Sequence, residues 1–355
     1  MERKARQENI EALRILAMLM VITMHYLQKG GILLPLSENT GGVNLLAWLV
    51  ESLCIGAANA YVLISGYFLV EASWKWQKLV SLVVQIWLYS FMIPLICLAL
   101  SIGNVAEWTV YDWITALFPL GAEHYWFATA YLVLYLFVPV LRAGVKVLDK
   151  KQHQLVLGLL LLAFSLEKSL SPVLLPTDHY GYDFGWFMIL FLVAAYFRLY
   201  GFSFLEKGNR ALWIYLGTAV LIWGLSLGMA ALSSMGLPLA YMRDMLYSYN
   251  HVLVLVLSVA LFVAFSRLEI RTKWLKILVL SVAPYTFGVY LLHENMAVRY
   301  LWQQWSKIEG VRGSFLFVPH MVITVCLVFL GGVAVDFFRS CLFGAVAALR
   351  KGGAS

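Results

Sequence analysis

Charged residues are scarce in this chain of 355 residues. Asp, Glu, Lys and Arg together make up 13% of it, whereas 62% is hydrophobic, and the mean hydropathy is +0.81. These values lie far outside the usual range of soluble globular proteins and predict an integral membrane protein. No linker rich in Gly, Ser or Pro and no internal repeat interrupts the sequence. We therefore expect residues 1–355 to form a single transmembrane domain without an appended soluble domain.

The motifs of familiar soluble enzymes are also missing. The sequence contains no Gly-rich phosphate loop, dinucleotide-binding fingerprint, serine elbow or His-Glu-x-x-His pattern. Its four cysteines lie in apolar segments without the spacing of metal ligands, so we interpret them as small buried hydrophobes and predict no metal site. Any chemistry must then be carried out by the helical bundle itself or with a separate partner.

Apolar segments recur along the whole chain and predict an all-α, polytopic bundle of about ten transmembrane helices. They cover approximately residues 10–28, 44–70, 79–102, 124–141, 154–167, 184–200, 211–234, 248–266, 275–293 and 315–343. The fifth segment is short, and the last is long enough either to tilt or to break at Gly331 and Gly332. The first lacks a small-residue cleavage site, so we interpret it as an uncleaved helix.

The basic residues indicate how these helices cross the membrane. Lys and Arg outnumber Asp and Glu by 26 to 19, which gives a formal net charge of +7. If the N-terminus lies inside, most of the basic residues fall in cytoplasmic segments, which these residues prefer, and both termini are predicted to be cytoplasmic. Because the charge is spread over segments that flank helices, contact with anionic lipid headgroups explains it, and we expect no nucleic-acid partner.

Arg14 and His25 stand out because both lie in the first apolar segment. Ionisable residues inside membrane helices usually serve a function. Eleven residues on a helix return to nearly the same face after a rise of about 16 Å, so one stripe carries both groups. The alternative is structural: Arg14 reaches the cytoplasmic headgroups, and His25 forms a hydrogen bond inside the bundle.

Several further polar residues are predicted to lie near the outer surface. His25, His251 and His293 lie in or at the ends of apolar helices and have polar sequence neighbours, which predicts a polar cavity that opens outward. Around the start of the fourth segment lie Glu123, His124, Trp126 and Tyr131. These residues are typical of an interfacial aromatic belt, but aromatic rings beside carboxylates also bind sugars, and we include them with His251 and His293 as candidate substrate-binding residues.

Two questions about charged partners stay open at this point. The candidates for a carboxylate partner of His25 are, in decreasing order, Glu294, Glu123 and Glu51. Lys75 and Lys78 lie three residues apart on the cytoplasmic side, where they could hold a phosphate group or simply anchor the helix at the headgroups.

Four sequence elements, in order, resemble acyltransferase family 3, bacterial multi-span O-acyltransferases of cell-surface glycans. They are Glu11-Ala12-Leu13-Arg14 with His25, Ile64-Ser65-Gly66-Tyr67-Phe68, His124-Tyr125-Trp126-Phe127 and Tyr290-Leu291-Leu292-His293. The resemblance covers essentially the whole chain. The chain departs from the family pattern at Lys75 and Lys78, where relatives often have Arg-x-x-Arg. Lysine keeps the positive charge but lacks the bidentate fork with which arginine binds phosphate. The appended esterase-like domain of many relatives is also missing.

The resemblance implies transfer of an acyl group, commonly acetyl, from cytoplasmic acyl-CoA to a hydroxyl of a cell-surface or lipid-linked glycan. It places the protein in the bacterial cytoplasmic membrane. His25 would act as general base or as an acyl relay, while Arg14, together with Lys75 and Lys78, would bind the coenzyme. Among the carboxylates, Glu294 remains the first candidate to assist His25. The pantetheine arm would follow the stripe from Arg14 to His25.

Two other classes of function fit a helical bundle around a polar cavity. A transporter or flippase would move a small polar solute or a lipid-linked sugar without chemistry, although we find no matching pair of broken segments of the kind that many transporters contain. A non-catalytic sensor or a subunit of a glycan-export complex would need the cavity but no acyl-CoA.

Overall fold

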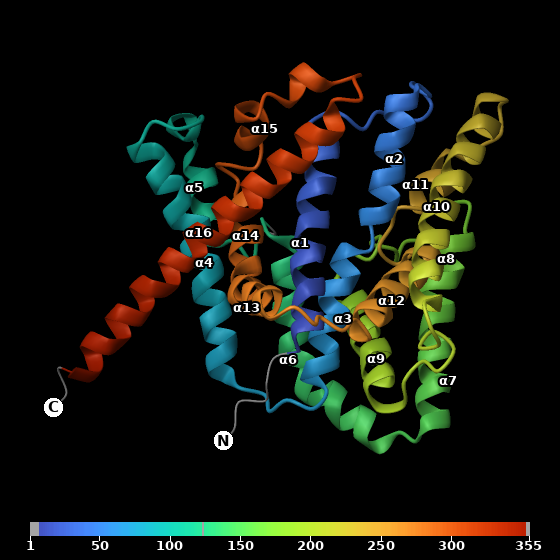
Figure 1. Cartoon of the computed structure of the whole chain (residues 1–355), viewed down its shortest axis with the longest axis horizontal. Helices are drawn as coiled ribbons and strands as arrows, with labels where there is room; N and C mark the ends of the chain where they lie inside the picture. The colour runs from blue at the N-terminus through green and yellow to red at the C-terminus, as the bar shows by residue number, and fades with distance from the viewer. Residues whose placement is uncertain (1–6, 123, 353–355) are drawn as a thin grey trace.

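The computed structural model describes residues 7–122 and 124–352, with side chains to residue 345. Within these residues the fold is entirely helical, which confirms the predicted fold class (Figure 1). The α-helices are α1 (Glu8–Lys29), α2 (Gly42–Cys54), α3 (Ala57–Leu69), α4 (Trp76–Ala99), α5 (Val110–Leu117), α6 (Trp126–Val147), α7 (Lys150–Leu161), α8 (Glu167–Leu170), α9 (Phe184–Tyr200), α10 (Arg210–Ser234), α11 (Ala240–Met245), α12 (Val252–Ser266), α13 (Lys273–Val282), α14 (Thr286–His293), α15 (Leu301–Trp305) and α16 (Phe317–Gly352).

Each of the ten predicted apolar segments forms helix. Eight helical stretches within the described residues are long and apolar enough to cross a membrane, and α9 and α12 are shorter, at 17 and 15 residues. The segment predicted at 154–167 is longer than the sequence suggested, because a π-helical turn, η2 (Leu162–Leu166), joins α7 to α8 and extends the stretch over Lys150–Leu170.

Two of the predicted helices are broken. Between α2 and α3, Gly56 lies so close to α12 that a Cβ atom added to it would come within 2.5 Å of the Leu257 side chain and 2.8 Å of the Ser258 hydroxyl. Between α13 and α14, the 3-10 turn η3 (Ala283–Tyr285) contains Pro284, which lacks the N–H that a continuous helix needs. α1 contacts the helices on both sides of each break.

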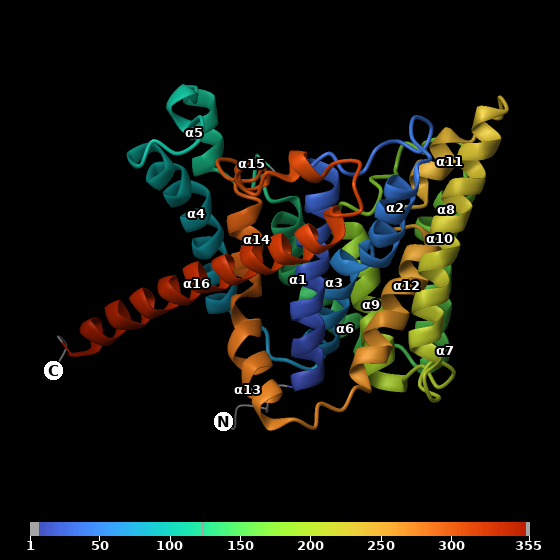
Figure 2. The ribbon, with the colours of Figure 1, turned by 45° about the horizontal axis from the view of Figure 1, so that its top comes forward.

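The last helix does not break at the glycine pair. α16 is continuous over 36 residues and runs obliquely across the bundle beyond α4 (Figure 2). Gly332 serves instead as a contact point, since a Cβ atom there would lie 2.9 Å from the Cα atom of Val289 on α14. Of the two predicted possibilities for this long segment, tilting is therefore the one realised.

The first helix occupies the centre of the bundle. α1 contacts α2, α3, α12, α13, α14 and α16 (Figure 1). Ile10, Leu13 and Ala17 on its apolar positions are fully buried. Because α1 is surrounded by helices, its polar side chains face protein or internal cavities rather than lipid, which is where ionisable groups in a membrane helix are tolerated.

Candidate active site

The predicted histidine of α1 lies in a cluster with the end of α14. Nδ1 of His25 is 3.0 Å from Nε2 of His293 and 3.2 Å from Oε1 of Glu294. One helical turn after His25, Lys29 donates a hydrogen bond to the same carboxylate oxygen. Of the three carboxylates proposed as a partner of His25, the structure thus brings Glu294 to it.

The hydrogen bonds determine which nitrogen of each imidazole carries the proton. Nδ1 of His293 lies 2.7 Å from the Val289 carbonyl oxygen, which can only accept, so this nitrogen is the donor. In a neutral ring, Nε2 of His293 then accepts from Nδ1 of His25. Oε1 of Glu294 lies 3.2 Å from the same Nδ1, and a carboxylate beside this nitrogen favours a proton on it over a lone pair. The lone pair of His25 is consequently on Nε2, which makes no hydrogen bond with any of the described residues.

Glu294 is ionised in this arrangement. Burial alone would raise the pKa of its carboxyl group, but the facing His25, His293 and Lys29 outweigh burial and lower that pKa. An ionised acceptor at Nδ1 stabilises the imidazolium that forms when Nε2 takes up a proton. The cluster is therefore suited to general-base chemistry, with Nε2 as the proton acceptor.

The same three residues also have the spacing of metal ligands. One donor atom from each of His25, His293 and Glu294 lies within 4.8 Å of the other two. A divalent ion such as zinc accepts this mixture of nitrogen and oxygen ligands. However, the Lys29 ammonium group is bonded to the carboxylate that such an ion would need, and its positive charge opposes a cation there. The arrangement favours a proton relay over a metal centre.

A polar cavity of about 700 Å³ opens on one side of His25. Its aromatic walls come from α2, the start of α6 and the loops before α9 and α12; these residues are Trp48, Trp126, Tyr182, Tyr247 and Tyr249. Its ionisable groups besides His25 and the tyrosines are Lys29, Glu51, Arg243, Asp244, Glu294 and Arg299. The Trp126 ring stacks on Tyr249 with centroids 5.5 Å apart. Flat rings beside carboxylates are suited to the apolar faces and hydroxyls of a sugar.

Glu51 lies in the wall of this polar cavity and does not contact His25. Gln28 donates a 2.6 Å hydrogen bond to its Oε1, and its Oε2 is buried without a partner among the described residues. A buried polar atom without a partner is unfavourable. The orphaned oxygen is therefore a candidate for accepting a hydrogen bond from a ligand hydroxyl.

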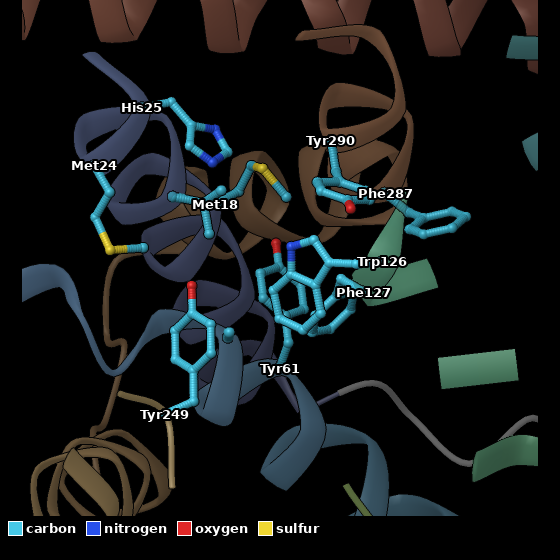
Figure 3. Close-up of a pocket in the computed structure, with 11 residues that line it drawn as sticks. Met18, Met24, His25, Tyr61, Trp126, Phe127, Tyr249, Phe287 and Tyr290 are labelled. Atoms are coloured by element: carbon cyan, nitrogen blue, oxygen red, sulfur yellow. The ribbon is translucent and has the colours of Figure 1, made fainter. Parts of the chain in front are cut away.

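A small apolar pocket of about 60 Å³ lies on the other side of His25. Met18, Val21, Met24 and Tyr61 are among the residues that line it. Figure 3 shows the His25 ring projecting into it, with Trp126 and Phe127 nearby. His25, Met24, Trp126 and Tyr249 line both spaces, so His25 lies where the polar cavity and the apolar pocket meet.

The predicted stripe on α1 exists, but it does not line an open passage. Met18, Val21 and His25 face the apolar pocket at helical spacing, and Arg14 lies one turn before Met18. Tyr61, at the pocket, donates a hydrogen bond to the Arg14 carbonyl oxygen. Arg14 lines neither space, and its guanidinium donates to buried Glu11 at 2.9 Å. The predicted path of a pantetheine arm along this stripe would require these side chains to move.

The other predicted residues are distributed over several regions. Trp126 and His293 belong to the site, whereas Tyr131 lies further along α6, stacked against Phe127. His251 is not brought to the polar cavity: its Nδ1 accepts from the Leu253 amide and caps α12. Lys75 and Lys78 are exposed near the start of α4, and the Lys78 ammonium lies 5.5 Å from the Tyr135 ring centre.

Two further candidate residues, Glu123 and His124, lie just before α6 in the sequence. Burial lowers the pKa of His124, and the positive charge of Arg299 lowers it further. His124 is half-buried and lines neither the polar cavity nor the apolar pocket. Glu123 lies outside the described residues.

Sequence reasoning missed some residues of the site. Lys29 follows His25 by four residues on the same helical face, so helical periodicity was a usable signal. Tyr182, Tyr249 and Arg299 come from irregular loops, where no periodicity indicates which way a side chain points.

The comparison with protein families identifies the family of the chain. The sequence model of a family described as an acyltransferase domain matches residues 7–336, nearly the whole chain. No curated protein and no solved structure matches the chain. The apolar helices and the family together make it a multi-pass membrane protein that carries out acyl transfer. The chain belongs to acyltransferase family 3.

Proposed function

We propose that the protein transfers an acetyl group from cytoplasmic acetyl-CoA to a hydroxyl of a cell-surface or lipid-linked glycan in the bacterial cytoplasmic membrane. The observation that carries this proposal is the free Nε2 of His25 at the junction of the polar cavity and the apolar pocket. A hydroxyl from one side and a thioester from the other can meet only at such a junction.

His25 acts as the general base in this proposal. Nε2 takes the proton of the acceptor hydroxyl as its oxygen attacks the thioester carbonyl, and the coenzyme A thiolate then leaves and takes that proton back from Nε2. Glu294 stabilises the intermediate imidazolium through Nδ1. The ester and free thiol are the products, and His25 returns to its starting tautomer. An acyl-histidine relay would use the same nitrogen as nucleophile.

The size of the apolar pocket supports a short acyl group. A volume of about 60 Å³ beside His25 is small compared with the roughly 150 Å³ cavity that accommodates benzene in an engineered protein. A two-carbon acyl group fits such a space better than a long chain does. Met18 and Met24 in its wall have flexible side chains that can move aside for the pantetheine arm.

The polar cavity supports a sugar as the acceptor. Trp126 and Tyr249 offer stacked aromatic surfaces, and the unpartnered oxygen of Glu51 offers an acceptor for a sugar hydroxyl. On the donor side, Arg14, Lys75 and Lys78 are proposed to contact the coenzyme's phosphate or carbonyl groups. For Arg14 this requires it to exchange Glu11 for the coenzyme.

The test uses purified full-length protein in lipid nanodiscs with radiolabelled acetyl-CoA and a lipid-linked glycan extract. We expect thiol release and labelled glycan from the wild type, and a loss of at least about 10²-fold in both for His25→Ala, given what a general base contributes. His179→Ala, an exposed histidine lining neither the polar cavity nor the apolar pocket, is the matched control. Wild-type transfer by folded His25→Ala removes His25 from the mechanism, and glycan movement without thiol release indicates a transporter.

A further inference from the structure

Among the residues that the structure describes, one positive charge of the polar cavity has no carboxylate paired with it. Lys29 is paired with Glu294, and Nε and Nη2 of Arg243 both lie 2.9 Å from Oδ1 of Asp244. Arg299 differs from these two: within the described parts of the chain, no carboxylate oxygen lies within 4.0 Å of its guanidinium. Its Nε is also buried without a hydrogen-bond partner there.

Arg299 is held in place by its surroundings. It lies in the loop between α14 and α15, where its amide donates a 2.8 Å hydrogen bond to the Asn295 carbonyl oxygen. The buried Asn295 side chain in turn donates to the Tyr89 carbonyl oxygen and the Tyr125 hydroxyl. The guanidinium carbon lies 5.4 Å from the centre of the Tyr300 ring, which covers one side of it. The loop thus presents this charge to the cavity from a fixed backbone.

An uncompensated guanidinium in a partly dehydrated cavity is unfavourable unless a ligand supplies the opposite charge. Guanidinium groups bind carboxylates and phosphates through two parallel hydrogen bonds, so such an anion is the natural counterpart. The position of Arg299 also identifies the side from which the anion comes. It lines the polar cavity but not the apolar pocket, so it faces the acceptor and not the thioester.

We infer that the glycan acceptor is anionic and that Arg299 binds its carboxylate or phosphate group beside the hydroxyl that is acylated. This inference rests on the proposed function, because it assigns the polar cavity to the acceptor. Lys29 and Arg243 contribute little to this selectivity, since each is neutralised by its own carboxylate. The acidic group belongs either to the sugar itself, as in a uronic acid, or to a phosphate that links the sugar to its carrier.

The experiment compares acceptors that differ in charge. Methyl glucuronide and methyl glucoside differ only at the sixth carbon, and glucose 1-phosphate tests the phosphate source. Binding is measured by quenching of tryptophan fluorescence, since Trp126 and Trp48 line the cavity, and transfer is measured with labelled acetyl-CoA. We expect at least tenfold tighter binding of one anionic probe than of methyl glucoside by the wild type, and which anion binds identifies the source.

Arg299→Gln should reduce that preference about 10- to 100-fold, the range expected for a hydrogen-bonded charge pair, and Arg299→Lys should restore part of it. Arg210→Gln, which changes an exposed arginine lining neither the polar cavity nor the apolar pocket, is the matched control and should keep the preference. Equal binding of charged and neutral probes by the wild type, or an equal loss for both in Arg299→Gln, overturns the inference. Charge-selective binding through Arg299 without any thiol release would instead refute only the proposed acyl transfer.

Discussion

Replacing Glu294 by glutamine is the most direct test of the hydrogen-bond chain around His25. The substitution keeps the size of the side chain and removes its negative charge. Two effects follow from the structure: the imidazolium at His25 loses its counter-charge, and Lys29 is left beside it without a carboxylate. Both effects disfavour the protonated His25 that forms during transfer, so the loss is expected in kcat.

The size of the effect follows from the geometry. Two unit charges at the 3.2 Å separation of His25 and Glu294 attract each other by about 5 kcal/mol at an effective dielectric constant of about 20. Lys29 shares the same oxygen and cancels part of this attraction, so we take roughly 3 kcal/mol as the loss. That loss corresponds to a decrease in kcat on the order of 10²-fold.

The assay is the steady-state rate of thiol release and labelled-glycan formation, with folding checked by size-exclusion chromatography. Glu38→Gln changes an exposed carboxylate in the loop before α2 and serves as the matched control. Glu51→Gln is expected to raise the KM of the acceptor more than it lowers kcat, because Glu51 does not contact His25. Adding Lys29→Met to Glu294→Gln should recover about tenfold in kcat, since it removes the uncompensated ammonium. A kcat for Glu294→Gln within threefold of wild type would refute the reasoning.

Three further outcomes are expected. Met18→Ala should enlarge the apolar pocket and raise the ratio of kcat/KM for butyryl-CoA to that for acetyl-CoA by at least tenfold; an unchanged ratio contradicts the role of the pocket. Dialysis against EDTA should leave the transfer rate unchanged, because Lys29 is bonded to the Glu294 carboxylate that a metal ion would need. A loss of transfer activity that added zinc restores would establish a metal centre instead. Gly288→Ala should lower the melting temperature, at a cost of about 1–3 kcal/mol, because its Cβ would lie 2.2 Å from Cγ of buried Asp336; Gly217→Ala, with no such neighbour, is the control.

The helices could be predicted because hydropathy is a local property. All ten segments form helix, and the long last one tilts. The breaks at Gly56 and Pro284 were not predicted, although both residue types are visible in the sequence. What fixes the first is the approach of α12, about 200 residues away, to the Gly56 backbone, as seen in the contact with Ser258. A local pattern carries no information about such a neighbour.

Which candidate residues lie near one another was predictable only within a single helix. Arg14 and His25 share α1, so their common face follows from helical spacing alone. The contact between His25 and His293 joins positions 268 residues apart and needed the fold. His251 has polar neighbours much like those of His293, yet it caps α12. Composition cannot tell these two histidines apart, because the difference lies in which acceptor or donor each ring meets.

The position of His25 along α1 explains how a single residue can join two unlike compartments. From Arg14 the stripe continues through Met18 and Val21, which are apolar, to His25 and then Lys29, which faces the polar cavity. The rise of about 16 Å between Arg14 and His25 is about half of a bilayer's hydrocarbon thickness. In the proposed mechanism, the apolar stretch would exclude water from one side of the imidazole, so a thioester arriving there would meet a nucleophile only from the polar cavity. The helix register itself would thus set the side from which the attack comes.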